Sequence, residues 1–191
     1  MTRRSWIPIL FLATAVAAQP TGAQPAPVIA PAVRFFGVTC GPASPEGSPR
    51  IEVVWTPRLG MGVGILLLGT WGYVGAGDCK MRGQAYLLVG ASNQQAGGVP
   101  LPYMLPLPLT MSFPCLLQVS AEVVAKADTP LAGMGSSHAS SIGLAIPNLP
   151  TLVGQKLYLQ WLVQRWQVGI NCPWVYPYFF TSNAAEITIG Y

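Results

Sequence analysis

Residues 156–164 decide the fold class, because large apolar side chains recur at every second position of their sequence KLYLQWLVQ. The large apolar side chains share one face of an extended segment: Leu157, Leu159, Trp161 and Val163. Gln160 and Gln164 fall on the opposite face, which we expect to meet solvent. Alternation with a period of two is typical of an antiparallel strand that is buried on one side.

Strand signals recur in five further segments: residues 50–56, 115–124, 140–146 and 184–191 show the same alternation, and residues 84–90 form a short apolar run bounded by Gly. In the first of these we expect three side chains to point inward together: Ile51, Val53 and Trp55. In 115–124 the expected inward residues are Leu117, Val119, Ala121 and Val123, and the expected outward ones are Gln118, Ser120 and Glu122. Stretches rich in Gly and Pro separate the segments. The pattern predicts an all-β domain of roughly eight strands, an antiparallel β-sandwich of the jelly-roll or immunoglobulin-like type.

The composition excludes several other classes of protein. The chain is 51% hydrophobic and only 8% charged, which is the reverse of what a disordered chain requires. Its 191 residues include 21 Gly and 19 Pro, too many for a coiled coil or a long helical bundle. A compact, turn-rich β protein remains.

The N-terminus has the features of a secretory signal peptide. Two arginines lie near its start, and residues 6–18 form an uncharged apolar run that ends in small side chains. We therefore expect a signal peptide over residues 1–18, with cleavage as late as residue 23 as the alternative. The leading TRRSWI also resembles a twin-arginine signal, so the Sec and twin-arginine export routes both stay open.

Residues 19–33 are uncharged and rich in Pro and Ala, which favours an extended linker. The remaining residues, 34–191, form a single β-sandwich domain in this interpretation, and the expected location is secreted or at the cell surface. Once the two leader arginines are removed, eight basic residues face six acidic ones. The basic residues are scattered rather than clustered, so we expect no nucleic-acid binding.

Residues 59–77 carry no charge over 19 positions, which is the length of a membrane span. Seven of these 19 residues are glycines, and glycine is unfavourable in a helix by about 1 kcal/mol relative to alanine. A buried strand or hairpin is therefore the favoured interpretation, with a membrane span as the alternative. We expect no membrane span in the mature chain.

The four cysteines are widely spaced and even in number, as in exported proteins with disulfides. Four cysteines allow three pairings, and among these we favour Cys40–Cys115 with Cys79–Cys172. No C-x-x-C motif is present and the chain has one histidine, so neither a metal site nor a cofactor is expected.

The C-terminal half resembles a large group of uncharacterised small secreted bacterial proteins. The resemblance is carried by residues 113–117 (FPCLL), 145–154 (AIPNLPTLVG), 157–161 (LYLQW) and 181–190 (TSNAAEITIG), and it covers about residues 38–191. It implies a β-sandwich in an extracellular or surface setting, and it supplies no catalytic residues. The chain departs from the group's pattern at Cys79 and at residues 168–180, as expected for an insertion closed by an extra disulfide.

No catalytic constellation is evident. The single histidine, His138, follows Ser136 and Ser137, but this sequence is not the G-x-S-x-G motif of a serine hydrolase. Glu122 and Glu186 are expected on outward strand faces, where solvated carboxylates are common. We therefore expect a protein that is not an enzyme.

The most suggestive segment is aromatic and lies at residues 168–180. Trp174, Tyr176 and Tyr178 alternate between prolines and beside Cys172, an arrangement able to present rings for stacking on sugars. The competing interpretation is that these rings close one end of the sandwich. Our leading hypothesis is a non-enzymatic secreted or surface domain that acts through contact with other extracellular proteins. The alternative is a carbohydrate-binding module that uses this aromatic loop to bind a polysaccharide.

Overall fold

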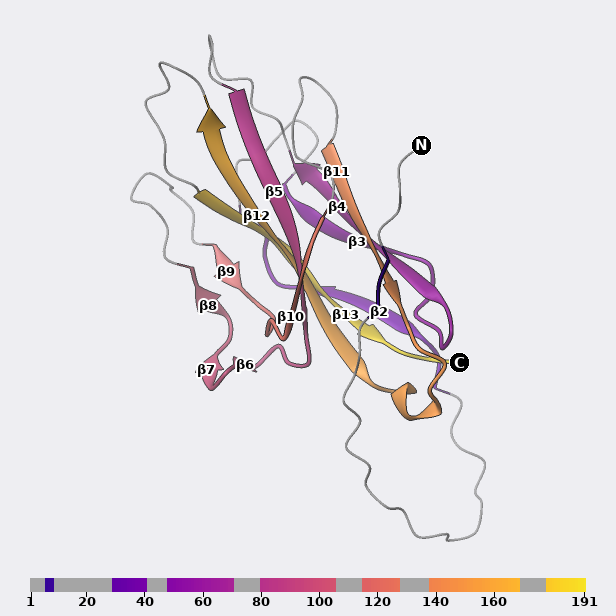
Figure 1. Cartoon of the computed structure of the whole chain (residues 1–191). Helices are drawn as coiled ribbons and strands as arrows, with labels where there is room; N and C mark the ends of the chain where they lie inside the picture. Colours follow the sequence, from indigo (N-terminus) through magenta and orange to yellow (C-terminus); the bar gives the residue numbers. More distant parts are fainter. Residues whose placement is uncertain are drawn as a thin grey trace, which may run out of the picture.

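The protein is a β-sandwich in the computed structural model, which describes residues 6–8, 29–40, 48–70, 80–105, 115–127, 138–168 and 178–191. One layer is a four-stranded sheet with the order β1 (Trp6–Pro8), β11 (His138–Ala145), β4 (Gly62–Thr70) and β3 (Arg50–Val54). The other is a five-stranded sheet with the order β10 (Val123–Lys126), β5 (Lys80–Gly90), β12 (Lys156–Val168), β13 (Tyr178–Thr188) and β2 (Ala32–Phe36). Figure 1 shows the long strands of both sheets running through the body of the molecule.

Two small ribbons complete the strands. They are β6 (Gln95–Ala96) with β7 (Val99–Pro100), and β8 (Tyr103–Met104) with β9 (Leu116–Leu117). A 3-10 helix spans Pro150–Leu152. Among the described strands, β1 and β11 are parallel and the other pairings are antiparallel. The predicted all-β class with antiparallel sheets is therefore confirmed.

The number of strands differs from the expected eight, because the described residues contain thirteen. Eight of them have four residues or more, and five are short pieces of two or three residues. Short ribbons of this kind carry too few residues for alternation to be detected in the sequence. The described residues contain no helix with the length and apolar character needed to cross a membrane.

The main core lies between the two sheets and draws on both of them. Leu157, Leu159, Trp161 and Val163 of β12 are buried, as their alternation predicted. They join the buried side chains of β4, which are Val63, Ile65 and Leu67. Residues 62–70 are therefore a buried strand. Residues 71–77, the rest of the uncharged stretch 59–77, lie outside the described residues. Burying one such side chain contributes about 1.5–3 kcal/mol.

Residues 115–124 do not form the single strand that their alternation predicted. They contain β9 and the start of β10, with an irregular stretch at 118–122 between them. Gln118 and Ser120, expected at the surface, are both buried. The reason is that residues 115–120 lie across the outer face of the five-stranded sheet instead of joining it edge to edge. We call residues 115–120 the covering segment.

A second, smaller core forms beneath the covering segment. Its buried members are Leu88 of β5, Val119 of the covering segment and Ala184 of β13. Leu117 and Leu162 pack against them. The five-stranded sheet is thus covered on both faces at its centre, which explains why Gln160 is fully buried and not in solvent as expected.

We predict that Gly90→Ala destabilises the protein, because the new Cβ would overlap the carbonyl oxygen of Ser120. The expected loss is about 3 kcal/mol, as for other overpacked sites. Gly97→Ala is the control, since no atom lies within 4 Å of a Cβ there. That variant is expected to lose about 1 kcal/mol through its positive φ alone. Urea unfolding measures both; equal losses would contradict the close approach at Gly90.

Candidate interaction surface

A disulfide joins Cys115 of the covering segment to Cys40, four residues after the end of β2, and their Cα atoms are 5.1 Å apart. This is one of the two pairings that the sequence analysis favoured, and it is confirmed. The N–H of Cys40 also donates to the carbonyl oxygen of Thr181 in β13, at 2.9 Å. The other cysteines, Cys79 and Cys172, lie outside the described residues, so their pairing stays a prediction.

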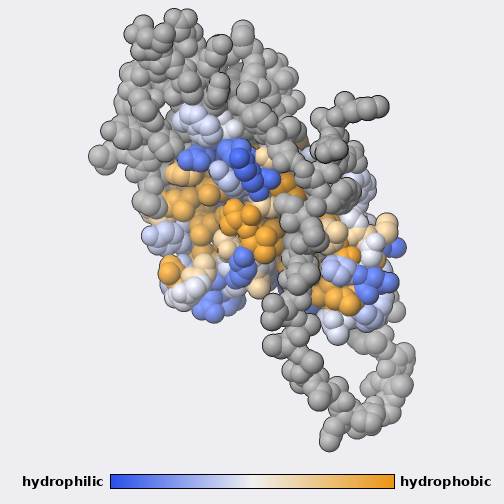
Figure 2. Space-filling model, viewed as in Figure 1, coloured by the Kyte–Doolittle hydropathy of each residue, from blue (hydrophilic) through white to orange (hydrophobic). Residues whose placement is uncertain are grey.

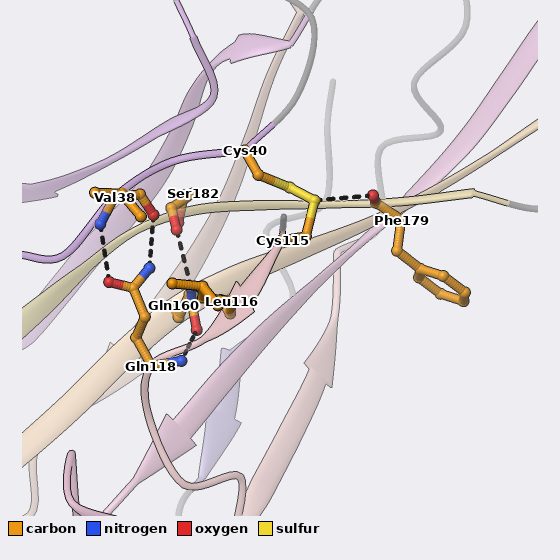
Figure 3. The surroundings of a disulfide bond; sticks show 8 residues. All are labelled: Val38, Cys40, Cys115, Leu116, Gln118, Gln160, Phe179 and Ser182. Carbon is orange, nitrogen blue, oxygen red and sulfur yellow. Dashed lines mark hydrogen bonds between the residues drawn. A yellow bond between two sulfur atoms is a disulfide. The ribbon is translucent and has the colours of Figure 1, made fainter. Parts of the chain in front are cut away.

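Gln118 forms a second tie between the covering segment and the end of β2 (Figure 3). Its Nε2 donates to the carbonyl oxygen of Val38 at 2.6 Å, and its Oε1 accepts from the Val38 N–H at 2.9 Å. The Gln118 side-chain amide thus pairs with both the N–H and the carbonyl group of Val38, in the way that the backbone of a neighbouring strand would. Gly37 has a φ of 72°, and a Cβ there would overlap the Gln118 amide. A glycine is therefore required at the end of β2.

Gln160 of β12 lies at the centre of this arrangement (Figure 3). Its Nε2 donates to the carbonyl oxygens of Leu116, at 3.0 Å, and Ser182, at 2.9 Å, and its Oε1 accepts from the N–H of Gln118 at 2.9 Å. Both amide protons and the amide oxygen are thus used in a fully buried site. Buried polar groups that are fully paired fix one arrangement of the elements around them.

The outer side of β2 is held against the sheet by its neighbours. The ring of Phe36 meets that of Tyr158 edge to face, with centroids 6.3 Å apart. Lys156 Nζ lies 2.8 Å from a carboxylate oxygen of Glu186. Burial raises the pKa of the Tyr158 hydroxyl above its ordinary value, and the negative charge of Glu186 raises it further. The ring contact thus attaches β2 to β12 on this side, and the ion pair joins β12 to β13 beside it.

The inner side of β2, in contrast, is open. Val33 and Phe35 are opposite Ile187 and Ala185 of β13, which are fully buried. Yet Val33 is 36% exposed and Phe35 is 47% exposed. The N–H of Ile51 in β3 donates to Asn183 Oδ1 of β13 at 3.0 Å, so the four-stranded sheet packs over β13. Val33 and Phe35 extend past its edge.

Within the described ranges, β2 pairs with β13 along one side, and its other backbone edge is unpaired. Exposed apolar side chains and an unpaired strand edge thus occur at one place. We call this feature, made of residues 32–36 with Val33 and Phe35 at its surface, the β2 overhang. Sequence alone does not reveal this feature, because the composition of residues 19–33 favours a linker that includes Val33, and alternation does not show where the opposite sheet ends.

Trp55 is a second exposed apolar feature, and it corrects a prediction. It was expected to point inward with Ile51 and Val53, but it is 60% exposed. β3 ends at Val54, and Trp55 has a φ of 69°, so its side chain leaves the alternation of the strand. A Cβ on Gly64 would lie 3.1 Å from the Trp55 ring, so the indole rests against a bare glycine of β4.

The residues that the sequence analysis proposed for ligand binding are mostly not described. Trp174 and Tyr176 lie outside the described residues, and Tyr178 is the first residue of β13, with its backbone opposite Arg165. The expectation that these rings form an exposed platform stays a prediction. In the described part of the chain, no cluster of His, Cys, Asp and Glu is able to hold a metal ion.

The acidic residues considered for catalysis have structural partners. Glu122 is exposed and accepts from the N–H of Ala91 at 3.0 Å and from the Ser120 hydroxyl at 2.8 Å. Glu186 is paired with Lys156. Glu122 thus supports the connection after β5, and Glu186 joins β13 to β12.

We predict that Gln160→Leu destabilises the protein by about 3 kcal/mol or more, because the Gln118 N–H and two carbonyl oxygens lose their partner in a buried site. Gln164→Leu is the matched control, since Gln164 lies on the same face of β12 and is half-buried. It is expected to change stability by less than about 1 kcal/mol. Thermal unfolding of both variants measures the difference; a stable Gln160→Leu protein would contradict the role of this amide.

Comparison with known proteins gives no match to a family model, a curated protein or a solved structure. The resemblance to small secreted bacterial β-sandwich proteins therefore stays a prediction.

Proposed function

We propose that the protein is a non-enzymatic domain, secreted or held at the cell surface, that acts through contact with other extracellular proteins. The β2 overhang is the proposed contact surface. The observation that carries this proposal is the exposure of Val33 and Phe35 on the face of β2 that is buried elsewhere in the sheet. Exposed apolar groups beside an unpaired strand edge are a typical site for strand addition by a partner.

The charges around β2 support this assignment. Natural proteins protect exposed strand edges with charged side chains, prolines or bulges. Arg34 is the one charged residue among residues 32–36, and its alternation with Val33 and Phe35 assigns it to the other face, opposite Glu186. The face that carries Val33 and Phe35 therefore lacks a protecting charge. A strand added beside β2 would cover both side chains and extend the five-stranded sheet.

The rest of the surface also suits a contact function. Figure 2 shows apolar side chains gathered over the region where β5, β10 and β12 cross in Figure 1, with hydrophilic groups around them. The exposed apolar residue of β10 is Val124. With only 8% charged residues, the chain is better suited to packing against other proteins than to attracting a charged substrate.

We predict that the double variant Val33→Lys, Phe35→Lys loses its extracellular partner. The immobilised mature protein is exposed to the extracellular protein fraction of its host, and retained proteins are quantified by mass spectrometry. Two buried lysines would disfavour the complex, so retention is expected to fall at least about tenfold, a loss of about 1.4 kcal/mol. Leu149→Lys is the control, because Leu149 is 46% exposed, close to the 47% of Phe35. Equal retention by both variants would reject the β2 overhang as the contact surface.

A carbohydrate-binding module remains the second candidate function, and one observation favours it. The indole of Trp55 is exposed and rests against Gly64, so its orientation is fixed without being buried. Exposed, fixed aromatic rings stack on the apolar faces of sugars. Trp55 is thus a described candidate for sugar stacking, separate in the sequence from the rings at residues 174–178.

We predict that, if the protein binds a polysaccharide, Trp55→Ala weakens that binding more than tenfold, a loss of about 1.4 kcal/mol or more. Affinity electrophoresis in polysaccharide gels, with Trp174→Ala beside it, measures the change and separates the two platforms. Met61→Ala is the control, since Met61 is also a large exposed apolar residue near the start of β4. Failure of the wild-type protein to bind any polysaccharide would reject this candidate.

A further inference from the structure

Strand β1 is the edge strand of the four-stranded sheet, and export is expected to remove it. Trp6, Ile7 and Pro8 pair in parallel with Gly143, Leu144 and Ala145 of β11. These β1 residues belong to the expected signal peptide, whose removal after residue 18 or 23 would take β1 away. β11 would then become the edge of its sheet. The inference below rests on the proposed function, since it requires export.

The edge of β11 differs from the other sheet edges in its charge. Residues 138–145 read HASSIGLA and contain no Asp, Glu, Lys, Arg or Pro. The other edge strands of the two large sheets each carry at least one charged residue, namely Arg34 in β2, Arg50 and Glu52 in β3, and Lys126 in β10. Among these strands, β11 is thus the one with no charged side chain on either face, whereas β2 carries Arg34 on the face opposite to Val33 and Phe35.

The shape of β11 also suits close approach by another strand. Its inward side chains Ser140, Ile142 and Leu144 are buried in the core, so the strand is firmly held. Its outward residues are small, because Ser141, Gly143 and Ala145 alternate along the other face. Ser141 and Ala145 are exposed. The pairing with β1 is direct evidence that this edge accepts an uncharged extended strand.

We propose that, in the exported protein, β11 pairs antiparallel with β11 of a second copy of this chain about a twofold axis. β11 is itself an uncharged extended strand, so self-pairing brings no like charges together. Self-pairing of β2 would instead bring two copies of Arg34 close to each other, which is unfavourable. The pairing joins two sheets of the order β11, β4 and β3 into one continuous sheet across the dimer.

The dimer has a consequence for the β2 overhang. β3 is at the end of the four-stranded sheet opposite to β11, and it packs over β13, the neighbour of β2. The two overhangs therefore lie at the outer ends of a β11-linked dimer, facing away from the shared edge. Such a molecule is bivalent and can join two partner proteins, which raises the overall strength of attachment.

The test uses the chain purified from an exporting host, with its N-terminus established by mass spectrometry. Light scattering coupled to size exclusion is expected to give a dimer. Ser141→Lys and Ala145→Lys introduce like charges at exposed positions of β11, so each is expected to raise the dimer dissociation constant at least about tenfold. Val124→Lys, at an exposed strand position in the other sheet, is the control and is expected to remain dimeric.

Several results would overturn the proposal. They are a mature protein that is monomeric up to about 100 µM, a leader that is retained, an unchanged dissociation constant in both β11 variants, and equal dissociation of Val124→Lys. Hydrogen exchange of the wild-type protein covers the case in which a variant fails to fold. Amides of residues 138–145 are expected to exchange more slowly as concentration rises, and concentration-independent exchange would also reject the dimer. A monomer that still loses its partner through Val33→Lys, Phe35→Lys would leave the proposed function standing.

Discussion

The amide of Gln160 is the constraint on which the rest of the architecture depends. It lies in the middle of β12, fully buried, and its three hydrogen bonds join that strand to the covering segment and to β13. Apolar contacts alone would tolerate several positions of residues 115–120 on the sheet. The Gln160 amide permits a single position of residues 115–120. Each of its hydrogen bonds has a fixed direction, and a missing hydrogen bond in a buried site is costly.

The position of β2 follows from that constraint. Once the covering segment is fixed, Cys115 meets Cys40 and the Gln118 amide meets Val38, so the chain beyond β2 is tied at two points. Phe36 and Tyr158 hold the outer side of the same strand. Val33 and Phe35 are therefore exposed on a rigid strand and not on a loosely attached arm. A rigid apolar edge binds a partner without a large loss of conformational entropy.

Much of the fold was predictable, because apolar alternation in residues 156–164 and 62–70 reflects burial directly. Gln160 was assigned to solvent, since a glutamine at an outward position has the same pattern whether or not another segment covers it. Alternation predicts that Trp55 lies in the core, because a tryptophan gives no sign in the sequence that its φ will be 69°. The β2 overhang depends on where the opposite sheet ends, which is a property of pairing between distant segments. Local sequence carries little of that information.

The pairing of β2 with β13 also bears on the order in which the sheet is completed during synthesis. Ala32 of β2 is opposite Thr188 of β13, close to the end of the chain. β2 therefore has no neighbouring strand until nearly the whole chain has been made. Contacts between segments so distant in sequence form late and slowly. An interrupted chain would lack β13 and would leave β2 with no sheet to join. The proposed contact edge is thus formed only once β13 is in place, so a truncated chain would not present β2 as part of a sheet.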